Sequence, residues 1–258
     1  MVIGLFVLTS ANTLHAKAIS IQNKKYYTFT YIVSNPSLGP VTGTSVTTVH
    51  IHKNKISAIN MVTGERLKEK NIPYKQILLE TIMKKTGKYQ IEYDSHHFPK
   101  KITLNSSSNI LGQTIIIKIL SYKIVNDSYV LDGQKLRKDY FKINYQKWLS
   151  LENEEYIFNY QDSKLKKSYI DGIEVSIKDN KVISLKDIYH SQFIDLSNKN
   201  KVRTINQLFN LTKRRLYDNK MNKLSVLYDI QYGYPYYIKN EKIEIFLHSL
   251  KIIKKGKK

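Results

Sequence analysis

Alternating apolar and polar residues open two distant parts of the chain. In YTFTY, residues 27–31, the side chains of Tyr27, Phe29 and Tyr31 share one face of a predicted strand, because successive side chains of a strand point to opposite sides. YIFNY, residues 156–160, repeats the alternation. This pattern is typical of a sheet with one buried face, so both segments predict strands of antiparallel sheets.

The rest of each part follows in the same order. Two alternating runs around an Asn-Lys pair are followed by a helical stretch, a run that ends in Tyr-Asp and Pro, and a last apolar strand. The nearly constant offset indicates two tandem copies of one unit and excludes a solenoid of short repeats. The matching segments are 27–31 with 156–160, 49–59 with 175–185, 89–102 with 224–238, and 118–125 with 246–253.

Two kinds of turn are expected in each copy. The Asn-Lys pairs at 54–55 and 180–181 lie between alternating runs and predict tight hairpin turns, since Asn tolerates left-handed backbone. In the Tyr-Asp segments, the carboxylates of Asp94 and Asp229 are expected to accept hydrogen bonds from backbone amides of the turn. Gly233 supplies backbone freedom in the second copy.

Helical spacing predicts one helix in each copy, within 72–85 and 203–216, and a further helix at 134–150 that leads into the second copy. Thr204 is a suitable N-cap for the second of these. The predicted buried positions are Tyr74, Ile77, Leu78 and Ile82 in the first copy, Ile205, Leu208, Phe209 and Leu216 in the second, and Leu136, Tyr140, Ile143 and Trp148 in the connecting helix.

These elements predict an α+β fold in which each copy has the order β-β-β-α-β-β-β, a small antiparallel sheet with one helix packed on a face. The predicted segments are an export signal at 1–16, the first copy at 17–125, a linker at 126–134, the second copy at 135–253 and a basic tail at 254–258.

The first residues resemble a secretory signal, with an apolar run from Val2 to Leu8 and a small-residue junction at Ala16. The run is far shorter than the roughly 20 residues that a membrane-spanning helix needs. No Lys or Arg precedes it, and Leu14 is larger than the residue usual at that place, so an opening β-strand is the alternative. We expect export to the periplasm or the extracellular space.

The chain is strongly basic, with 42 Lys and Arg residues against 21 Asp and Glu, a net charge of +21. Such a charge attracts anionic lipid, envelope polymer or nucleic acid. The alternative is solvated charge and compositional bias, because the basic residues are spread along the chain and are mostly Lys. Cysteine is absent, which excludes disulfides, Cys-ligated zinc and thiol nucleophiles.

Several motifs of the second copy occur together: Lys147-Trp148, the YIFNY strand, a Val-rich strand, a Leu-Phe helix and YDIQYGYP at 228–235. In this pattern residues 139–253 resemble a family of small exported bacterial domains of unknown function. The first copy resembles it more weakly, since it lacks the Trp. The resemblance implies export and a small α+β fold, and brings no activity, catalytic residue or cofactor.

Histidines suggest one candidate site. His50 and His52 alternate on one predicted strand and share a face. With Asp94, His96 and His97 of the same copy they form a candidate set of N and O ligands for Zn or Cu. The second copy has no His at the corresponding places, which favours ordinary polar residues instead.

Aromatic and basic residues suggest a second candidate site. Tyr232, Tyr234 and Tyr236 lie beside basic strands, and Arg214 and Arg215 lie in the last turn of a predicted helix. Stacking aromatics with cations can hold single-stranded nucleic acid or an anionic polymer. The alternative is a hairpin packed on its own helix, with arginines that complement the helix dipole.

No Gly-rich phosphate loop, nucleophile elbow or HExxH motif occurs, so we expect a protein that is not an enzyme and needs no cofactor. The sequence indicates an exported cell-envelope protein that acts as a binding or structural accessory module. Its expected partners are anionic envelope polymer or lipid headgroups, and export favours these over nucleic acid. A basic nucleic-acid- or anionic-polymer-binding protein and a His-based metal-binding protein are the alternatives.

Overall fold

The computed structural model describes residues 26–34, 45–52, 55–82, 89–95, 98–105, 114–151, 155–165, 168–169, 171–218 and 224–253. The chain divides into two compact units, residues 1–61 with 65–133 and residues 62–64 with 134–258. Each unit has one antiparallel sheet and few helices, as the α+β class requires. The predicted export signal and basic tail lie outside the described residues, as does the predicted turn residue Asn54.

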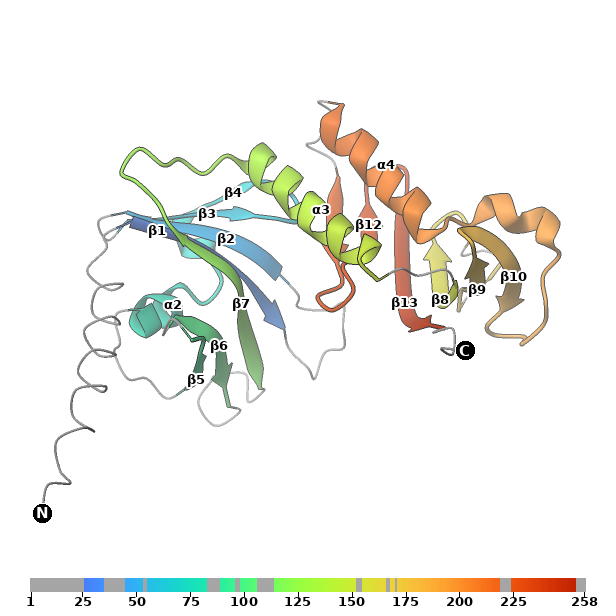
Figure 1. Ribbon diagram of the computed structural model, residues 1–258, viewed down its shortest axis with the longest axis horizontal. Coiled ribbons are helices and arrows are strands. Elements are labelled where there is room, and N and C mark those ends of the chain that lie inside the picture. The colour runs from blue at the N-terminus through green and yellow to red at the C-terminus, as the bar shows by residue number, and fades with distance from the viewer. Residues whose placement is uncertain are drawn as a thin grey trace, which may run out of the picture. The chain divides into compact units, whose positions relative to one another are not determined.

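The first unit is built on a seven-stranded sheet with the order β4-β3-β2-β1-β7-β6-β5 (Figure 1). Its elements are β1 (Tyr26–Ser34), β2 (Ser45–His52), β3 (Lys55–Asn60), β4 (Arg66–Leu67), the 3₁₀ helix η2 (Glu69–Asn71), α2 (Lys75–Ile82), β5 (Gln90–Tyr93), β6 (Pro99–Leu104) and β7 (Ile115–Ile124).

The predicted alternation of β1 is confirmed on the face that forms the core. Phe29 and Tyr31 are 1% and 0% exposed and pack in one cluster with Leu78 of α2. The Tyr31 hydroxyl donates a 2.8 Å hydrogen bond to the carbonyl of Pro73, just before α2. The strand and the helix are therefore held together by apolar burial and by a bond that satisfies the buried phenol.

The second unit is built on a six-stranded sheet with the order β10-β9-β8-β13-β12-β11. Its elements are α3 (Gly133–Leu149), β8 (Glu155–Asp162), β9 (Ile173–Lys178), β10 (Lys181–Asp187), the 3₁₀ helix η4 (Leu196–Lys201), α4 (Ile205–Tyr217), β11 (Ser225–Tyr228), β12 (Pro235–Lys239) and β13 (Glu244–Ile252).

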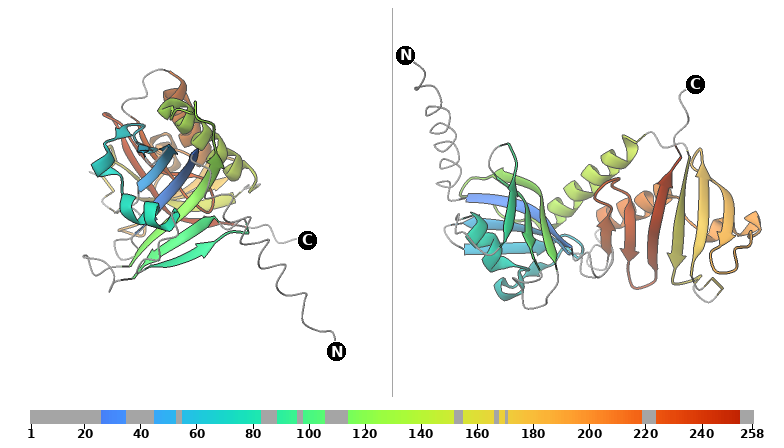
Figure 2. Two further views of the ribbon diagram at one scale, coloured as in Figure 1. Left: turned by 90° about the vertical axis from the view of Figure 1, so that its left-hand side faces the viewer. Right: turned by 90° about the horizontal axis from the view of Figure 1, so that it is seen from below.

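Both helices of the second unit pack on one face of its sheet, which Figure 2 shows from a second direction. Tyr156, Phe158 and Tyr160 of β8 are at most 2% exposed and alternate with half-buried residues. The Trp148 ring of α3 lies edge-on to the Tyr156 ring at 5.3 Å between centroids. The Phe209 side chain of α4 belongs to the same cluster. This confirms the one-sided burial that the alternation in β8 predicts.

The predicted packing face of α3 is confirmed at Trp148, which is 4% exposed, and at Tyr140, which packs partly buried against the core, but it is wrong at Ile143. Ile143, a predicted buried position, is 61% exposed. The face is set by the aromatic contacts of Phe141 and Trp148 with α4 and β8, so the residues in register with them are buried even where they are polar. The Asn144 amide donates to the Tyr140 carbonyl at 2.8 Å, which satisfies it there. The buried residues of α3 are Arg137, Phe141, Asn144 and Trp148.

The predicted cap of α4 is confirmed. The Thr204 hydroxyl accepts from the Gln207 amide at 3.2 Å, and the Gln207 side chain accepts from the Thr204 amide at 2.9 Å.

The β9–β10 hairpin also forms, but its turn residues are Asp179 and Asn180, at φ 49° and 59°. Lys181, predicted as part of the turn, begins β10 because it pairs with the last residue of β9.

The turn after the second Tyr-Asp is closed by a carboxylate, as predicted. Asp229 Oδ1 accepts from the amides of Gln231 and Tyr232 at 2.9 and 2.6 Å. Gly233 follows at φ 79°, and a Cβ there would lie 2.5 Å from the Asn144 carbonyl oxygen of α3. In the first unit, Asp94 Oδ1 accepts from the Phe98 amide at 2.9 Å. Gly233 is needed both for its left-handed backbone and for its close approach to α3.

Gly233→Ala is expected to lower the free energy of unfolding of the second unit by about 2 kcal/mol or more, since it combines a left-handed Ala with a backbone clash. Urea unfolding followed by the fluorescence of Trp148, the single Trp of the chain, measures this. Gln231→Ala in the same turn keeps the backbone bond and serves as the control, with an expected change within about 0.5 kcal/mol. Equal midpoints for the two variants would contradict the account of the turn.

Candidate functional site

A groove of about 620 Å³ lies within the second unit, between the β9–β10 turn, η4 and α4. A groove of this size can hold a small ligand or one unit of a polymer. Most of its lining is polar or basic. The lining residues are Asn180, Lys181, Val182, Lys199, Asn200, Val202, Arg203, Thr204, Gln207, Asn210, Leu211 and Arg214.

Local sequence places the three walls. The left-handed Asp179-Asn180 turn ends β9 and starts β10 at Lys181. Asp195 caps η4 by accepting from the Ser197 amide at 2.8 Å, which directs the η4 chain towards Lys199. Residues 204, 207, 211 and 214 recur at helical spacing, so one face of α4 forms the third wall.

All the charged residues that line the groove are basic. Lys181, Lys199, Arg203 and Arg214 line it, and no acidic residue is among the lining residues. Lys181, Lys199 and Arg214 are exposed. Within the part of the chain that the structure describes, these three form no ion pair. Clustered cations without local neutralisation raise the concentration of anions in a cleft.

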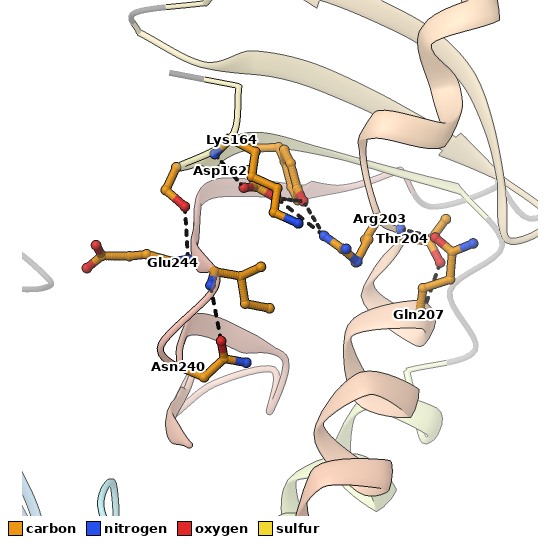
Figure 3. Close-up of polar contacts among 10 residues, drawn as sticks. Asp162, Lys164, Arg203, Thr204, Gln207, Asn240 and Glu244 are labelled. Atoms are coloured by element: carbon orange, nitrogen blue, oxygen red, sulfur yellow. Dashed lines mark hydrogen bonds and ion pairs between the residues drawn. The ribbon is translucent and has the colours of Figure 1, made fainter. Parts of the chain in front are cut away.

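The lining residue Arg203 is held by a carboxylate, and Figure 3 shows its contact with Asp162. Its Nη1 donates to Asp162 Oδ2 and to the Tyr160 hydroxyl, both at 3.3 Å. The Tyr160 hydroxyl donates to the same Asp162 oxygen at 3.0 Å. The other Asp162 oxygen accepts from the Lys164 amide at 2.9 Å. The guanidinium is thus oriented before any ligand binds.

Burial, more than this network, favours the protonated form of Tyr160. Burial and then the Asp162 carboxylate raise the pKa of Tyr160 well above its usual value, and Arg203 only partly opposes them. Tyr160 is 0% exposed and Asp162 is 4% exposed, so neither reaches the solvent in the groove. The pair acts on the site through the position of Arg203.

The residues predicted for anion binding do not all lie at the groove. Arg214 lines the groove, whereas Arg215 on the same turn does not. Tyr234 is 6% exposed, and its ring lies 6.3 Å from that of Trp148. Tyr232 and Tyr236 pack half-buried against the same core, so the three tyrosines do not line the groove. Stacking on them stays a prediction, and their packing matches the alternative of a hairpin on its own helix.

The predicted metal ligands are only partly within the described residues, since His96 and His97 lie outside them. His50 and His52 do share a face, with 6.1 Å between ring centroids. Burial lowers the pKa of His50, and His52 Nε2 lies 3.3 Å from Asp127 Oδ1. Among the described residues no three His, Cys, Asp or Glu side chains are grouped to hold a metal ion. The metal site stays a prediction.

Sequence reasoning missed Lys181, Lys199 and Arg203 as site residues. They lie in three separate segments of a chain with 42 basic residues, so none stands out along the sequence. Only Arg203 has a sequence feature that gives its place in the fold: it directly precedes Thr204, the N-cap of α4. Its partner Asp162 follows YIFNY by two residues, and that distance in sequence gives no indication of contact.

Asp162→Asn is expected to lower the free energy of unfolding of the second unit by about 3 kcal/mol, because Arg203 and Tyr160 lose their buried anion. Urea unfolding followed by Trp148 fluorescence measures it. The control is Asp171→Asn, which removes one exposed carboxylate of the same unit and should change little. If both variants unfolded at the same urea concentration, the Asp162 contacts would contribute nothing to stability.

The groove lies in a part of the chain that matches a known protein family. Residues 140–246 match the model of a family described as "Family of unknown function (DUF6174)". No curated protein matches the chain. Among the described residues, no helix is both long and apolar enough to cross a membrane. Over residues 140–246, which include every residue that lines the groove, the chain is therefore similar to a family of unknown function, as its motifs predict.

Proposed function

We propose that the protein is an exported cell-envelope protein whose second unit binds anionic groups in the basic groove and catalyses no reaction. The anions are those of an envelope polymer or of lipid headgroups. The observation that carries the proposal is the lining itself: four basic residues, three of them without an ion pair among the described residues, and no acidic residue.

The groove has the donors that such a ligand needs. Arg203 offers a planar guanidinium that Asp162 already holds in place, which suits a phosphate or carboxylate. Lys199 and Lys181 add point charges from two other walls. The side-chain amides of Asn180, Asn200 and Asn210, which also line the groove, supply uncharged donors for a polar backbone or headgroup.

The same lining supports binding without catalysis. General acid-base catalysis needs a group that exchanges a proton near neutral pH, and His and carboxylates are the usual choices. Neither type is among the lining residues. The Thr204 hydroxyl is already used by the cap of α4, and Tyr160 behind Arg203 holds its proton. The cations can bind and orient an anion, and the described residues that line the groove include no group suited to activate a nucleophile.

The proposal includes a tandem origin for the two units. Apart from β4, the two sheets place corresponding strands in the same order, with the first and last strands paired at the centre. A helix precedes the last three strands in each unit. These features and the ordered sequence matches support the duplication of one ancestral unit. Binding is assigned to the second copy alone, because the groove residues belong to it.

Charge reversal tests the groove directly. Lys199→Glu with Arg214→Glu is expected to weaken binding to a heparin-like sulfated polysaccharide at least about tenfold at low salt. The slope of log K against log salt should become shallower by about two, because two cations no longer displace counterions. Fluorescence anisotropy of a labelled polysaccharide over a salt series measures both quantities.

The matched control is Lys142→Glu with Lys251→Glu, which makes the same charge change at exposed positions of α3 and β13 away from the groove. It should lose much less affinity. Equal losses in the two double variants would show that the ligand responds only to net charge, and would reject the groove as the binding site.

Export rests on the apolar run at 2–8 and the junction at Ala16, and has its own test. The mature chain is expected in the envelope or extracellular fraction of the producing cell, with Lys17 as its first residue. Cell fractionation followed by mass spectrometry of the N-terminal peptide gives both results. A chain that begins at Met1 and remains in the cytosol would contradict export.

A further inference from the structure

The edge of the second sheet that carries the groove also exposes apolar side chains. In the segment between β10 and η4, Tyr189 is 65% exposed and Phe193 is 81% exposed. Ile183 of β10 and Leu196 of η4 are 44% and 42% exposed. Single exposed apolar residues are common on proteins, but four within 14 residues, on an edge strand and the chain that follows it, are an unusual concentration.

Hydrogen bonds cross the segment that carries the two aromatic residues. Asp187 Oδ1 accepts from the amides of Tyr189 and His190 at 2.9 and 3.3 Å, and its Oδ2 lies 2.7 Å from His190 Nδ1. The Asp187 amide donates to the Gln192 carbonyl at 2.8 Å. Phe193 forms a β-bridge with Lys186. The aromatic rings are therefore presented to solvent on a bonded frame, which reduces the entropy lost on binding.

This apolar segment is joined along the chain to two elements that line the groove. η4 leads from Leu196 to the groove residues Lys199 and Arg203, and β10 leads from Lys181 to Ile183. Figure 1 shows β10 and the chain that follows it at the edge of the six-stranded sheet. The same elements at this edge thus carry both basic and exposed apolar residues, and this combination is typical of a surface that meets the headgroup layer of a membrane.

We infer that this edge of the second unit docks on an anionic lipid surface. The Phe193 and Tyr189 rings enter the boundary between headgroups and acyl chains, and the groove cations bind lipid phosphates. The inference rests on the proposed anion-binding function and names its ligand. A lipid surface fits better than a soluble polymer because Ile183 and Leu196 have no ring face on which a sugar or base could stack. The charge of +21 complements an anionic membrane.

Vesicle sedimentation with the full chain tests the inference. The probes are phosphatidylcholine vesicles with and without phosphatidylglycerol, and the heparin-like polysaccharide. Tyr189→Ser with Phe193→Ser should weaken binding to phosphatidylglycerol vesicles by roughly tenfold or more, since two rings no longer leave water. Binding to the polysaccharide should be unchanged. Ile143→Ser with Leu149→Ser, which alters exposed apolar residues of α3, should change neither.

A second measurement keeps the test independent of the stability of the Ser variant. Trp148 is 4% exposed and its indole donates to Asn206, so vesicles should not alter its emission. Phe193→Trp therefore adds a reporter at the segment itself. Its emission should shift to shorter wavelength with phosphatidylglycerol vesicles and stay unshifted with the polysaccharide.

The outcomes separate the two proposals. Unaltered vesicle binding by the Ser variant with no emission shift would overturn membrane docking, and so would binding to the polysaccharide without binding to vesicles. In either case the loss of polysaccharide binding on charge reversal of the groove would still support the proposed function. If charge reversal had no effect on either probe, the proposed function would fail and membrane docking with it.

Discussion

One-sided burial of the six-stranded sheet is the constraint on which the second unit depends. Tyr156, Phe158 and Tyr160 place their rings on a single face, and burying rings of that size stabilises the unit far more than any surface contact. Both α3 and α4 must cover that face. Because the apolar side of α4 packs on the sheet, its other side places Gln207 and Arg214 at the groove. The start of β10, at the edge of the sheet, forms another wall of the groove.

The same strand links the core to the site. β8 ends at Asp162, whose carboxylate is almost fully buried beside the Tyr160 ring and holds Arg203 directly before α4. A buried carboxylate needs a cation and hydrogen-bond donors, and Arg203, Tyr160 and the Lys164 amide provide them. The position of the guanidinium in the groove therefore follows from the packing of the sheet and does not require a ligand to set it.

The sequence allowed the elements to be predicted much better than their assembly. The alternation in β8 and the Thr204 cap are local patterns with a physical cause at each position, and both form as expected. The face of α3 depends on where Phe209 and Tyr156 lie in space, so Ile143 was misplaced. The groove depends on strand pairing and on the path of η4, which bring Lys181 and Lys199 together. In a chain with 42 basic residues, nothing in the local sequence distinguishes these two lysines from the others.

Whether the groove binds anions is tested most directly by amide chemical shifts of the isotope-labelled chain during titration with inorganic tripolyphosphate. Binding in the groove predicts saturable shifts confined to residues 180–182, 199–207 and 210–214, with the indole signal of Trp148 unmoved. Shifts spread over the exposed lysines of both units, or none at concentrations that screen charge, would contradict the account.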